Sequence, residues 1–375
     1  MDTISEDWRV LSTLLPSGWQ DLARATGAVK RLRGFDSMDA VLRTLLMHVG
    51  HGWSLRETVV QAKLAGIAEV SDVALMDRLR LAEPWLRTLC EELWKANGVR
   101  LEPAMKDRPV RLVDATTVKE PGKTGSLWRI HYSLRLPGLE CDHFQLTPAR
   151  GKGNGERLGR FAFQPGELVL ADAGYSHPPG ILAVSARKAA LCVRLNPLSV
   201  PLQDTHQQPF PLRAKLQALQ ATERGDWPVL VVSKGQSVAG RVCAVRKSEQ
   251  EIARAQRRID KKHIRRVSSG SEETREYARY VMVFTTLTNT EASSVEVLEC
   301  YRQRWQIELT FKRLKSIVQL GHVPKQDDGS SRAWLFGKLL VALLAERLAK
   351  VGSAISPWGY YLDGVAADTK PLAGV

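Results

Sequence analysis

The chain has 375 residues, with 54 Lys and Arg against 40 Asp and Glu, and its formal net charge is +14. This length is enough for two or three domains, and a hydrophobic content of 44% supports a sizeable core. The five cysteines are scattered singly, which argues against a structural zinc site and a disulfide framework. No run of 18 apolar residues and no signal-peptide core occur, so the sequence predicts a protein without a membrane partner.

The positive charge is concentrated in the middle of the chain. Residues 1–100 hold 13 basic and 13 acidic side chains, whereas residues 101–240 and 241–279 each carry a net charge of +6. An excess of positive charge favours a polyanionic partner, above all nucleic acid. We therefore expect the middle of the chain to meet most of that partner.

Residues 1–104 are predicted to form an N-terminal helical domain. Apolar residues recur with a helical period in stretches separated by Gly or Pro: 8–15, 38–49, 55–65, 73–81 and 85–94. Ser54 and Glu57 fit a helix-capping box. The two helices joined at 65–70 resemble a helix-turn-helix, which leaves two interpretations open, a contact with DNA ends or a plain packing bundle.

Residues 105–195 are predicted to form a sheet. Runs rich in β-branched residues, several of them apolar on both faces as in buried strands, occur at 110–118, 127–136, 139–147, 167–172 and 190–195. A helix is expected at 178–188, and Pro137-Gly138 predicts a hairpin turn. The basic, glycine-rich loop 151–160 is predicted to contact phosphates, although it lacks a Walker-type ending.

Residues 196–290 are predicted to form a β-rich, basic insertion. Strands are expected at 229–233, 240–245 and 280–287, with a strongly basic helix at 249–267. Residues 291–350 return to helix, ending in an amphipathic helix at 334–350. Periodicity is lost over 351–375, which is predicted to be a loose C-terminal tail.

The stretch 301–315 contains no Pro or Gly and is predicted to be one helix, with Ser293 and Glu296 as a capping box upstream. On a regular helix Tyr301, Arg304, Glu308 and Lys315 would share a stripe about 60° wide and roughly 21 Å long. Phosphates for the cations and a metal ion for the carboxylate would suit this stripe. The alternative is an ordinary Arg304–Glu308 pair at i,i+4 on a helix surface.

Three carboxylates stand out by their positions. Asp114 lies within an apolar strand, Asp172 ends another, and Glu308 lies on the stripe. An ionised carboxylate in such a place is costly unless it is paired or bound to a metal. If the strands of Asp114 and Asp172 are neighbours, the three groups make a set of hard oxygen ligands suited to Mg²⁺ or Mn²⁺. Turn or capping roles for the two aspartates are the alternative.

Three blocks of sequence together resemble a known family. The spacing Tyr301-x2-Arg304-x3-Glu308-x6-Lys315 is similar to the Tyr-Arg-Glu-Lys signature of the DDE transposases related to insertion sequence four. The segments 113–116 (Val-Asp-Ala-Thr) and 170–175 (Leu-Ala-Asp-Ala-Gly-Tyr) resemble that family's first and second catalytic blocks, in the same order. The resemblance covers roughly residues 105–345. It implies an α/β fold, with a ribonuclease H-like mixed-sheet core interrupted by the β-rich insertion.

The resemblance also implies a role for each candidate residue. Asp114, Asp172 and Glu308 would bind two Mg²⁺ ions, with Mn²⁺ able to substitute. Tyr301, Arg304 and Lys315 would grip phosphates beside the cleaved bond, and an aromatic residue of the insertion, Trp227 or Tyr280, would hold a flipped base. The basic helix would follow DNA phosphates without reading bases, through the cations Arg254, Arg257, Arg258, Lys261, Lys262, Arg265 and Arg266.

The implied activity is cut-and-paste DNA transposition. The enzyme would cleave at the inverted repeats of an insertion sequence, with a DNA hairpin as the implied route, and join the ends to target DNA as a homodimer on the nucleoid in the cytoplasm. Two alternatives stay open. One is a degenerate or domesticated copy that binds DNA without completing transposition, which the short stretch after Lys315 favours. The other is a ribonuclease H-like nuclease that makes no joints.

Overall fold

The computed structural model describes residues 3–96, 105, 107–119, 126–220, 223–264, 272–324 and 327–353. The chain divides into two compact units. The helical unit comprises Met1–Val99, Val118–Ser126 and Lys312–Val375, and the sheet unit comprises Arg100–Thr117 and Leu127–Phe311. The predicted tail at 351–375 lies almost wholly outside the described residues.

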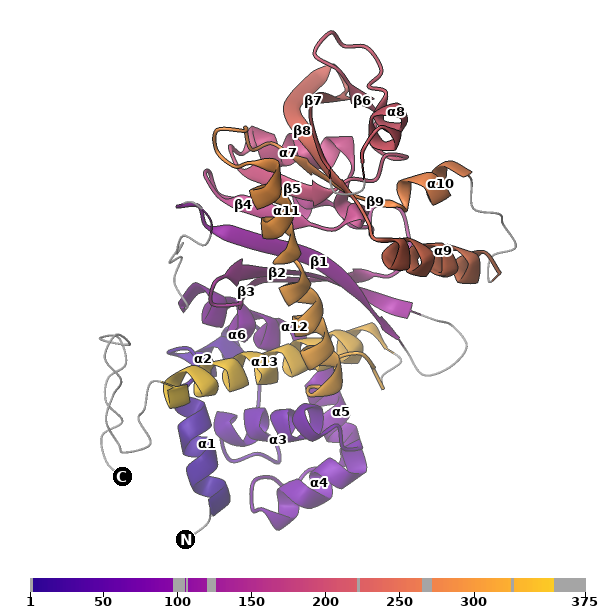
Figure 1. Ribbon diagram of the computed structural model, residues 1–375. Helices are drawn as coiled ribbons and strands as arrows, with labels where there is room; N and C mark the ends of the chain where they lie inside the picture. The colour runs from indigo at the N-terminus through magenta and orange to yellow at the C-terminus, as the bar shows by residue number, and fades with distance from the viewer. Residues whose placement is uncertain are drawn as a thin grey trace. The chain divides into compact units, whose positions relative to one another are not determined.

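Most helices of the helical unit lie where the apolar periodicity predicted them, whereas the short helix at Trp19–Ala25 was not predicted (Figure 1). The helices of this unit are α1 (Thr3–Thr13), α2 (Trp19–Ala25), α3 (Met38–His51), α4 (Leu55–Leu64), α5 (Asp72–Leu81), α6 (Glu83–Ala96) and α13 (Asp328–Ser353). The side chains of Ser37, Ser54 and Ser71 cap α3, α4 and α5 by accepting a backbone N–H bond. The long helix α13 packs against α3, α5 and α6, and Trp85, fully buried, stacks on Trp19.

The sheet has nine strands in the order β3-β2-β1-β4-β5-β9-β8-β7-β6 (Figure 1). Its first five strands along the chain are β1 (Val110–Lys119), β2 (Ser126–Leu136), β3 (Glu140–Pro148), β4 (Leu168–Ala171) and β5 (Ala190–Arg194). Strands β1, β4 and β5 pair in parallel, and β2 and β3 form the predicted antiparallel hairpin. This order and direction confirm the α/β class and the ribonuclease H-like mixed sheet.

The predicted insertion extends the same sheet. Strands β6 (Leu202–Gln203), β7 (Arg224–Ser233), β8 (Gln236–Arg246) and β9 (Tyr280–Thr285) are antiparallel, and β9 joins them to β5. Helices α8 (Leu212–Gln217), α9 (Glu249–Ile264) and α10 (Glu272–Tyr277) lie in the insertion, whereas α7 (Pro178–Ala186) connects β4 to β5. The basic helix therefore forms as predicted, as far as the structure describes it. The domain boundaries given above stay predictions.

The single helix predicted over 301–315 is wrong. The structure has α11 (Ser294–Arg302) and α12 (Trp305–Ser316), separated by a turn at Gln303 and Arg304. The backbone N–H groups of both turn residues bond to carbonyls three residues back, as in a 3₁₀ turn. With no Pro or Gly to break the helix, tertiary contact explains the turn, because carboxylates hold the Arg304 side chain.

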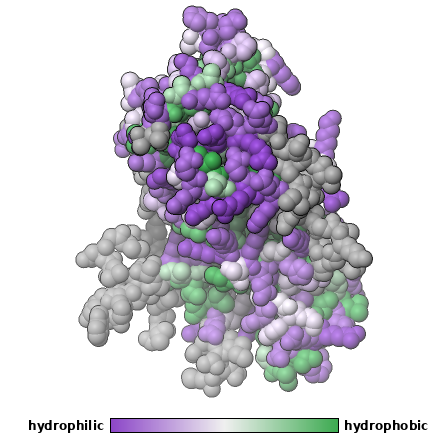
Figure 2. All heavy atoms as spheres, turned by 45° about the vertical axis from the view of Figure 1, so that its right-hand side comes forward, coloured by the Kyte–Doolittle hydropathy of each residue, from purple (hydrophilic) through white to green (hydrophobic). Residues whose placement is uncertain are grey.

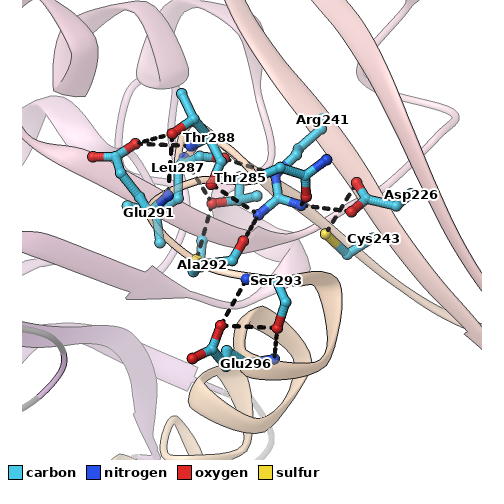
Figure 3. A network of polar contacts seen from close by, with 12 residues as sticks. Asp226, Arg241, Cys243, Thr285, Leu287, Thr288, Glu291, Ala292, Ser293 and Glu296 are labelled. Atoms are coloured by element: carbon cyan, nitrogen blue, oxygen red, sulfur yellow. Dashed lines mark hydrogen bonds and ion pairs between the residues drawn. The ribbon is translucent and has the colours of Figure 1, made fainter.

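A buried arginine fixes where α11 begins (Figure 3). Arg241 on β8 pairs with Asp226 on β7 at 2.6 Å, and its Nε atom donates to the Leu287 carbonyl at 2.7 Å. Its Nη2 atom donates to the Ala292 carbonyl, directly before the Ser293–Glu296 capping box that opens α11. The helix then packs against β5, β7, β8 and β9. The sheet therefore determines where α11 delivers Tyr301.

Candidate active site

Asp114, in the middle of β1, lies beside the end of the neighbouring strand β4, after which Asp172 follows. Strand β1 pairs in parallel with β4, and Val113 stands opposite Ala171. The next residue along the chain is an aspartate in both cases, so the register itself brings the two carboxylates together. Asp172 leads into the 3₁₀ turn Ala173–Tyr175, and its Oδ1 atom is buried without a hydrogen-bond partner among the described residues.

The environment of Asp114 disfavours its negative charge. Burial is the main reason that its pKa rises to about 7, and the neighbouring charges of Asp172 and Glu156 push it in the same direction. The Ala115 N–H bond, 2.7 Å long, and the guanidinium of Arg304 oppose this rise without cancelling it. A carboxylate in such a setting is stabilised in its charged form by a further cation.

Arg304 spans two of the three candidate carboxylates. Its Nη2 atom lies 2.5 Å from Glu308 Oε1, and its Nη1 atom lies 3.6 Å from Asp114 Oδ2. The i,i+4 pair that sequence left as an alternative therefore exists. It is no ordinary surface pair, however, because only 12% of the Arg304 side chain is exposed and a carboxylate of another element shares it.

Tyr301 places its ring beside this guanidinium. The ring is buried, and the Arg304 Cζ atom lies 5.7 Å from its centroid. Burial lowers the pKa of Arg304, but Tyr301, Glu308 and Asp172 together raise it above its usual value. Lys315 is exposed near the end of α12 and belongs to the helical unit. The sheet unit thus gathers Asp114, Asp172, Tyr301, Arg304 and Glu308.

Comparison with known proteins gives the family. Residues 150–344 match the model of the transposase DDE domain. The chain is 32% identical over 330 residues to a transposase of insertion sequence element IS186A from Escherichia coli, covering 86% of this chain and 88% of that one. This chain belongs to the DDE transposases of insertion sequences.

More distant relatives agree. The transposase of IS421 from Escherichia coli is 31% identical over 331 residues, covering 86% of this chain and 88% of that one. The transposase of IS231B from Bacillus thuringiensis is 23% identical over 374 residues, covering 88% of this chain and 77% of that one.

A cryo-EM structure of the piggyBac transposase synaptic complex with hairpin DNA covers 92% of this chain and 74% of that one. Its TM-score is 0.43 at 8% identity, a likeness too weak to support a conclusion.

DDE transposases use divalent metal ions, and the donor atoms of this site suit such ions. Carboxylate oxygens are hard ligands, and the buried Oδ1 of Asp172 lacks a hydrogen-bond partner in the described part of the chain. Yet no group of three Asp, Glu, His or Cys residues in the described ranges is close enough to hold an ion. Arg304 stands between Asp114 and Glu308, which accounts for this separation.

A basic cavity opens beside Tyr301 and Arg304. Its volume is about 700 Å³, and Trp305, half exposed, lines it. Its cations come from β5, the residue after β8, α9, α11 and the turn that follows α11. They are Arg194, Lys247, Arg254, Arg258, Arg302 and Arg304. Burial, and secondarily Arg194, lowers the pKa of Lys247 to about 8. The face shown in Figure 2 is predominantly hydrophilic where the residues are described.

The predicted basic helix contributes only part of this lining. Arg254 and Arg258 line the cavity, whereas Arg257 and Lys261 are exposed on the same helix α9. The side chain of Lys262, and all of Arg265 and Arg266, lie outside the described residues.

The two predicted candidates for a flipped base lie within the sheet part of the transposase. Trp227 packs partly buried against Phe210, and Tyr280 is buried. The sequence gives no signal for the half-exposed Trp305, because a single helix over 301–315 places it outside the stripe of Tyr301, Arg304, Glu308 and Lys315.

Sequence reasoning also missed Glu156 and Arg129. Glu156 lies in the glycine-rich loop, where its neighbouring glycines and cations drew attention to phosphate binding instead. Arg129 is an ordinary member of β2 by pattern. Their ion pair, 3.1 Å between Arg129 Nη1 and Glu156 Oε1, becomes visible only once the sheet is folded.

Proposed function

We propose that this DDE transposase cleaves the ends of its insertion sequence with Asp114, Asp172 and Glu308 as ligands of two Mg²⁺ ions, for which Mn²⁺ can substitute. The cleaved ends are then joined to target DNA in a cut-and-paste reaction. The observation that supports this most is the pairing of β1 with β4, which sets Asp114 and Asp172 side by side, with Arg304 connecting Asp114 to Glu308.

The chain's own residues prepare the site for this chemistry. Asp114 and Asp172 are held by neighbouring strands, so their carboxylates need little reorganisation to meet a cation. When bound, the metal ions supply an activated nucleophile and stabilise the leaving oxygen of the phosphodiester. Burial of Asp114 strengthens electrostatic interactions within the site.

Arg304 exchanges partners during the reaction. Without metal its guanidinium neutralises Asp114 and Glu308. If Asp114 and Glu308 held metal ions, they would no longer need this pairing, and the guanidinium would be free to bind elsewhere. A guanidinium binds phosphate through two parallel N–H bonds, so Arg304 then holds the backbone beside the cleaved bond. Tyr301 flanks it, and Lys315 binds a further phosphate.

The DNA strand runs from this site over the basic cavity. Arg254 and Arg258 line the cavity, and Arg257 and Lys261 extend the positive charge along α9. Such contacts give affinity without sequence choice. Inverted repeats and target DNA are the partners, and because two ends must be joined, the DNA complex contains two copies of the chain.

Because its substrate is DNA, the enzyme acts on the bacterial nucleoid. None of the described helices is long and apolar enough to cross a membrane.

Cleavage of the element's own inverted repeats tests this function. A duplex carrying one repeat, incubated with the protein and Mg²⁺, is expected to be cut at the repeat end, and added target DNA yields joined products. Glu308→Gln is expected to abolish both products. Glu299→Gln, at an exposed position of α11, is the matched control and retains them. Cleavage by Glu308→Gln at the rate of the unaltered protein would contradict the ligand assignment.

A further inference from the structure

Glu156 reaches the candidate centre from a loop outside the blocks 113–116, 170–175 and 301–315. It lies between β3 and the short 3₁₀ turn Leu158–Arg160. Its Oε1 atom accepts a bond of 3.1 Å from Nη1 of Arg129 on β2. About 30% of its side chain is exposed, so this is a partly buried charge at the edge of the site rather than a surface residue.

The carboxylate of Glu156 lies against the turn that carries Asp172. A Cβ atom added to Gly174 would stand 1.6 Å from Glu156 Oε2, which is far inside any van der Waals contact. Gly174 is two residues after Asp172, so the glycine of this turn leaves the space that the carboxylate fills. The close approach fixes where the Glu156 charge lies.

That position brings Glu156 into the electrostatic environment of both aspartates. Its negative charge contributes to the raised pKa of Asp114, and Asp172 in turn contributes, after burial, to a raised pKa of Glu156. Tyr175 gives an independent indication. Its side chain is fully buried, its hydroxyl has no hydrogen-bond partner in the described ranges, and it senses the charges of Asp114 and Glu156.

Two cationic groups oppose this negative charge at Glu156 itself. Arg129 contributes most, and His177 adds a smaller effect. Arg304 plays the corresponding part for Asp114. The centre therefore has an acidic side and a set of counter-charges, and Arg129 is the counter-charge that belongs to Glu156.

We propose that Glu156 is a fourth functional carboxylate of this centre, whose charge, set against Arg129, raises the affinity of Asp114 and Asp172 for a divalent cation. It acts through those two aspartates and is a positioning residue, not a ligand. This inference rests on the proposed function. Residues behind the direct ligands commonly change metal affinity by about tenfold or more when they are replaced.

Mn²⁺ binding to the full-length protein without DNA tests this directly, with electron paramagnetic resonance counting the unbound ion. Glu156→Gln keeps the shape of the side chain and removes its charge, so Mn²⁺ affinity should fall about tenfold. Arg129→Gln removes the counter-charge, so Mn²⁺ affinity should rise. Glu156→Asp keeps the charge and should restore most of the affinity. Thermal unfolding of each variant checks that it is folded.

The two variants of the ion pair separate this proposal from a structural role. If the pair only supports the fold, Glu156→Gln and Arg129→Gln will change Mn²⁺ affinity in the same direction, and Glu156→Asp will not restore it. Either result overturns the proposal while leaving the proposed function intact. The proposed function fails in a different way, when Asp114→Asn and Asp172→Asn leave Mn²⁺ affinity unchanged.

Discussion

The two aspartates and the Tyr301–Glu308 segment reach the same site by different structural means. Asp114 and Asp172 are fixed by one strand register, because β1 and β4 pair directly before both residues. Tyr301, Arg304 and Glu308 lie on two helices and the turn between them. Their placement depends on a buried arginine and on the carboxylates that hold Arg304. Backbone pairing makes the half of the site with the two aspartates rigid. In the other half, the Tyr301–Glu308 segment, Arg304 can exchange its partners.

The largest expected effect concerns Arg304, the residue that exchanges its partners. Arg304→Met removes the guanidinium and keeps an apolar stem. Cleavage should fall about a hundredfold, as when one donor to developing charge is removed. Mn²⁺ binding without DNA should instead tighten, because Asp114 and Glu308 lose the cation that competes for them. Cleavage assays and Mn²⁺ titrations measure the two effects.

Arg313→Met is the control for this change. Arg313 is an exposed residue of α12, and its replacement should leave Mn²⁺ affinity unaltered. Weaker Mn²⁺ binding by Arg304→Met would show that Arg304 supports the carboxylates instead of competing for them.

The anchoring of the helical segment gives the second prediction. Arg241→Met leaves the partly buried Asp226 without its cation and frees the Ala292 carbonyl at the start of α11. Breaking a buried pair in this way costs about 3 kcal/mol in the free energy of unfolding. Chemical denaturation measures this loss, and cleavage should fall with it because α11 delivers Tyr301. Arg224→Met, at an exposed position of β7, should change the unfolding free energy little. Equal stability of the two variants would refute the anchoring role.

The rigid half has a pH signature. The pKa of Asp114 is raised to about 7 in the folded protein, from an ordinary value of 3.8. The folded state therefore holds its proton more tightly than the unfolded state, and the stability that this gives is complete below about pH 4 and is lost as pH rises to 7. In metal-free protein Asp114→Asn should remove this loss. The unfolding temperature of the variant should therefore exceed that of the unaltered protein by an amount that grows from pH 4 to 7. A constant difference across this range would contradict the shift.

The sequence predicted the rigid half better than the exchangeable half. Strand positions follow from local pattern, and parallel pairing of two buried strands brings Asp114 and Asp172 together without further information. The turn at Gln303 and Arg304 could not be predicted, because its cause is a contact with Asp114, 190 positions away in the chain. The role of Glu156 could not be predicted for the same reason, because it depends on contacts with Gly174 and Arg129 rather than on the sequence of its own loop.

The smallest expected effect concerns exposed cations of α9, which belong to neither half of the site. Arg257→Gln and Lys261→Gln each remove an exposed cation of α9. Each should weaken DNA binding a few-fold, equally for specific and unrelated sequences, and reduce the slope of log affinity against log salt by about one. Fluorescence anisotropy over a salt series measures this. A loss confined to the inverted repeat would instead assign these residues to base recognition.

A crystal structure with Mn²⁺ and a pre-cleaved inverted-repeat end tests the central claim most directly. Anomalous scattering should place Mn²⁺ between the carboxylates of Asp114, Asp172 and Glu308, with the Arg304 guanidinium moved onto a DNA phosphate. Mn²⁺ bound elsewhere, or Arg304 still between Asp114 and Glu308 with metal and DNA present, would contradict it.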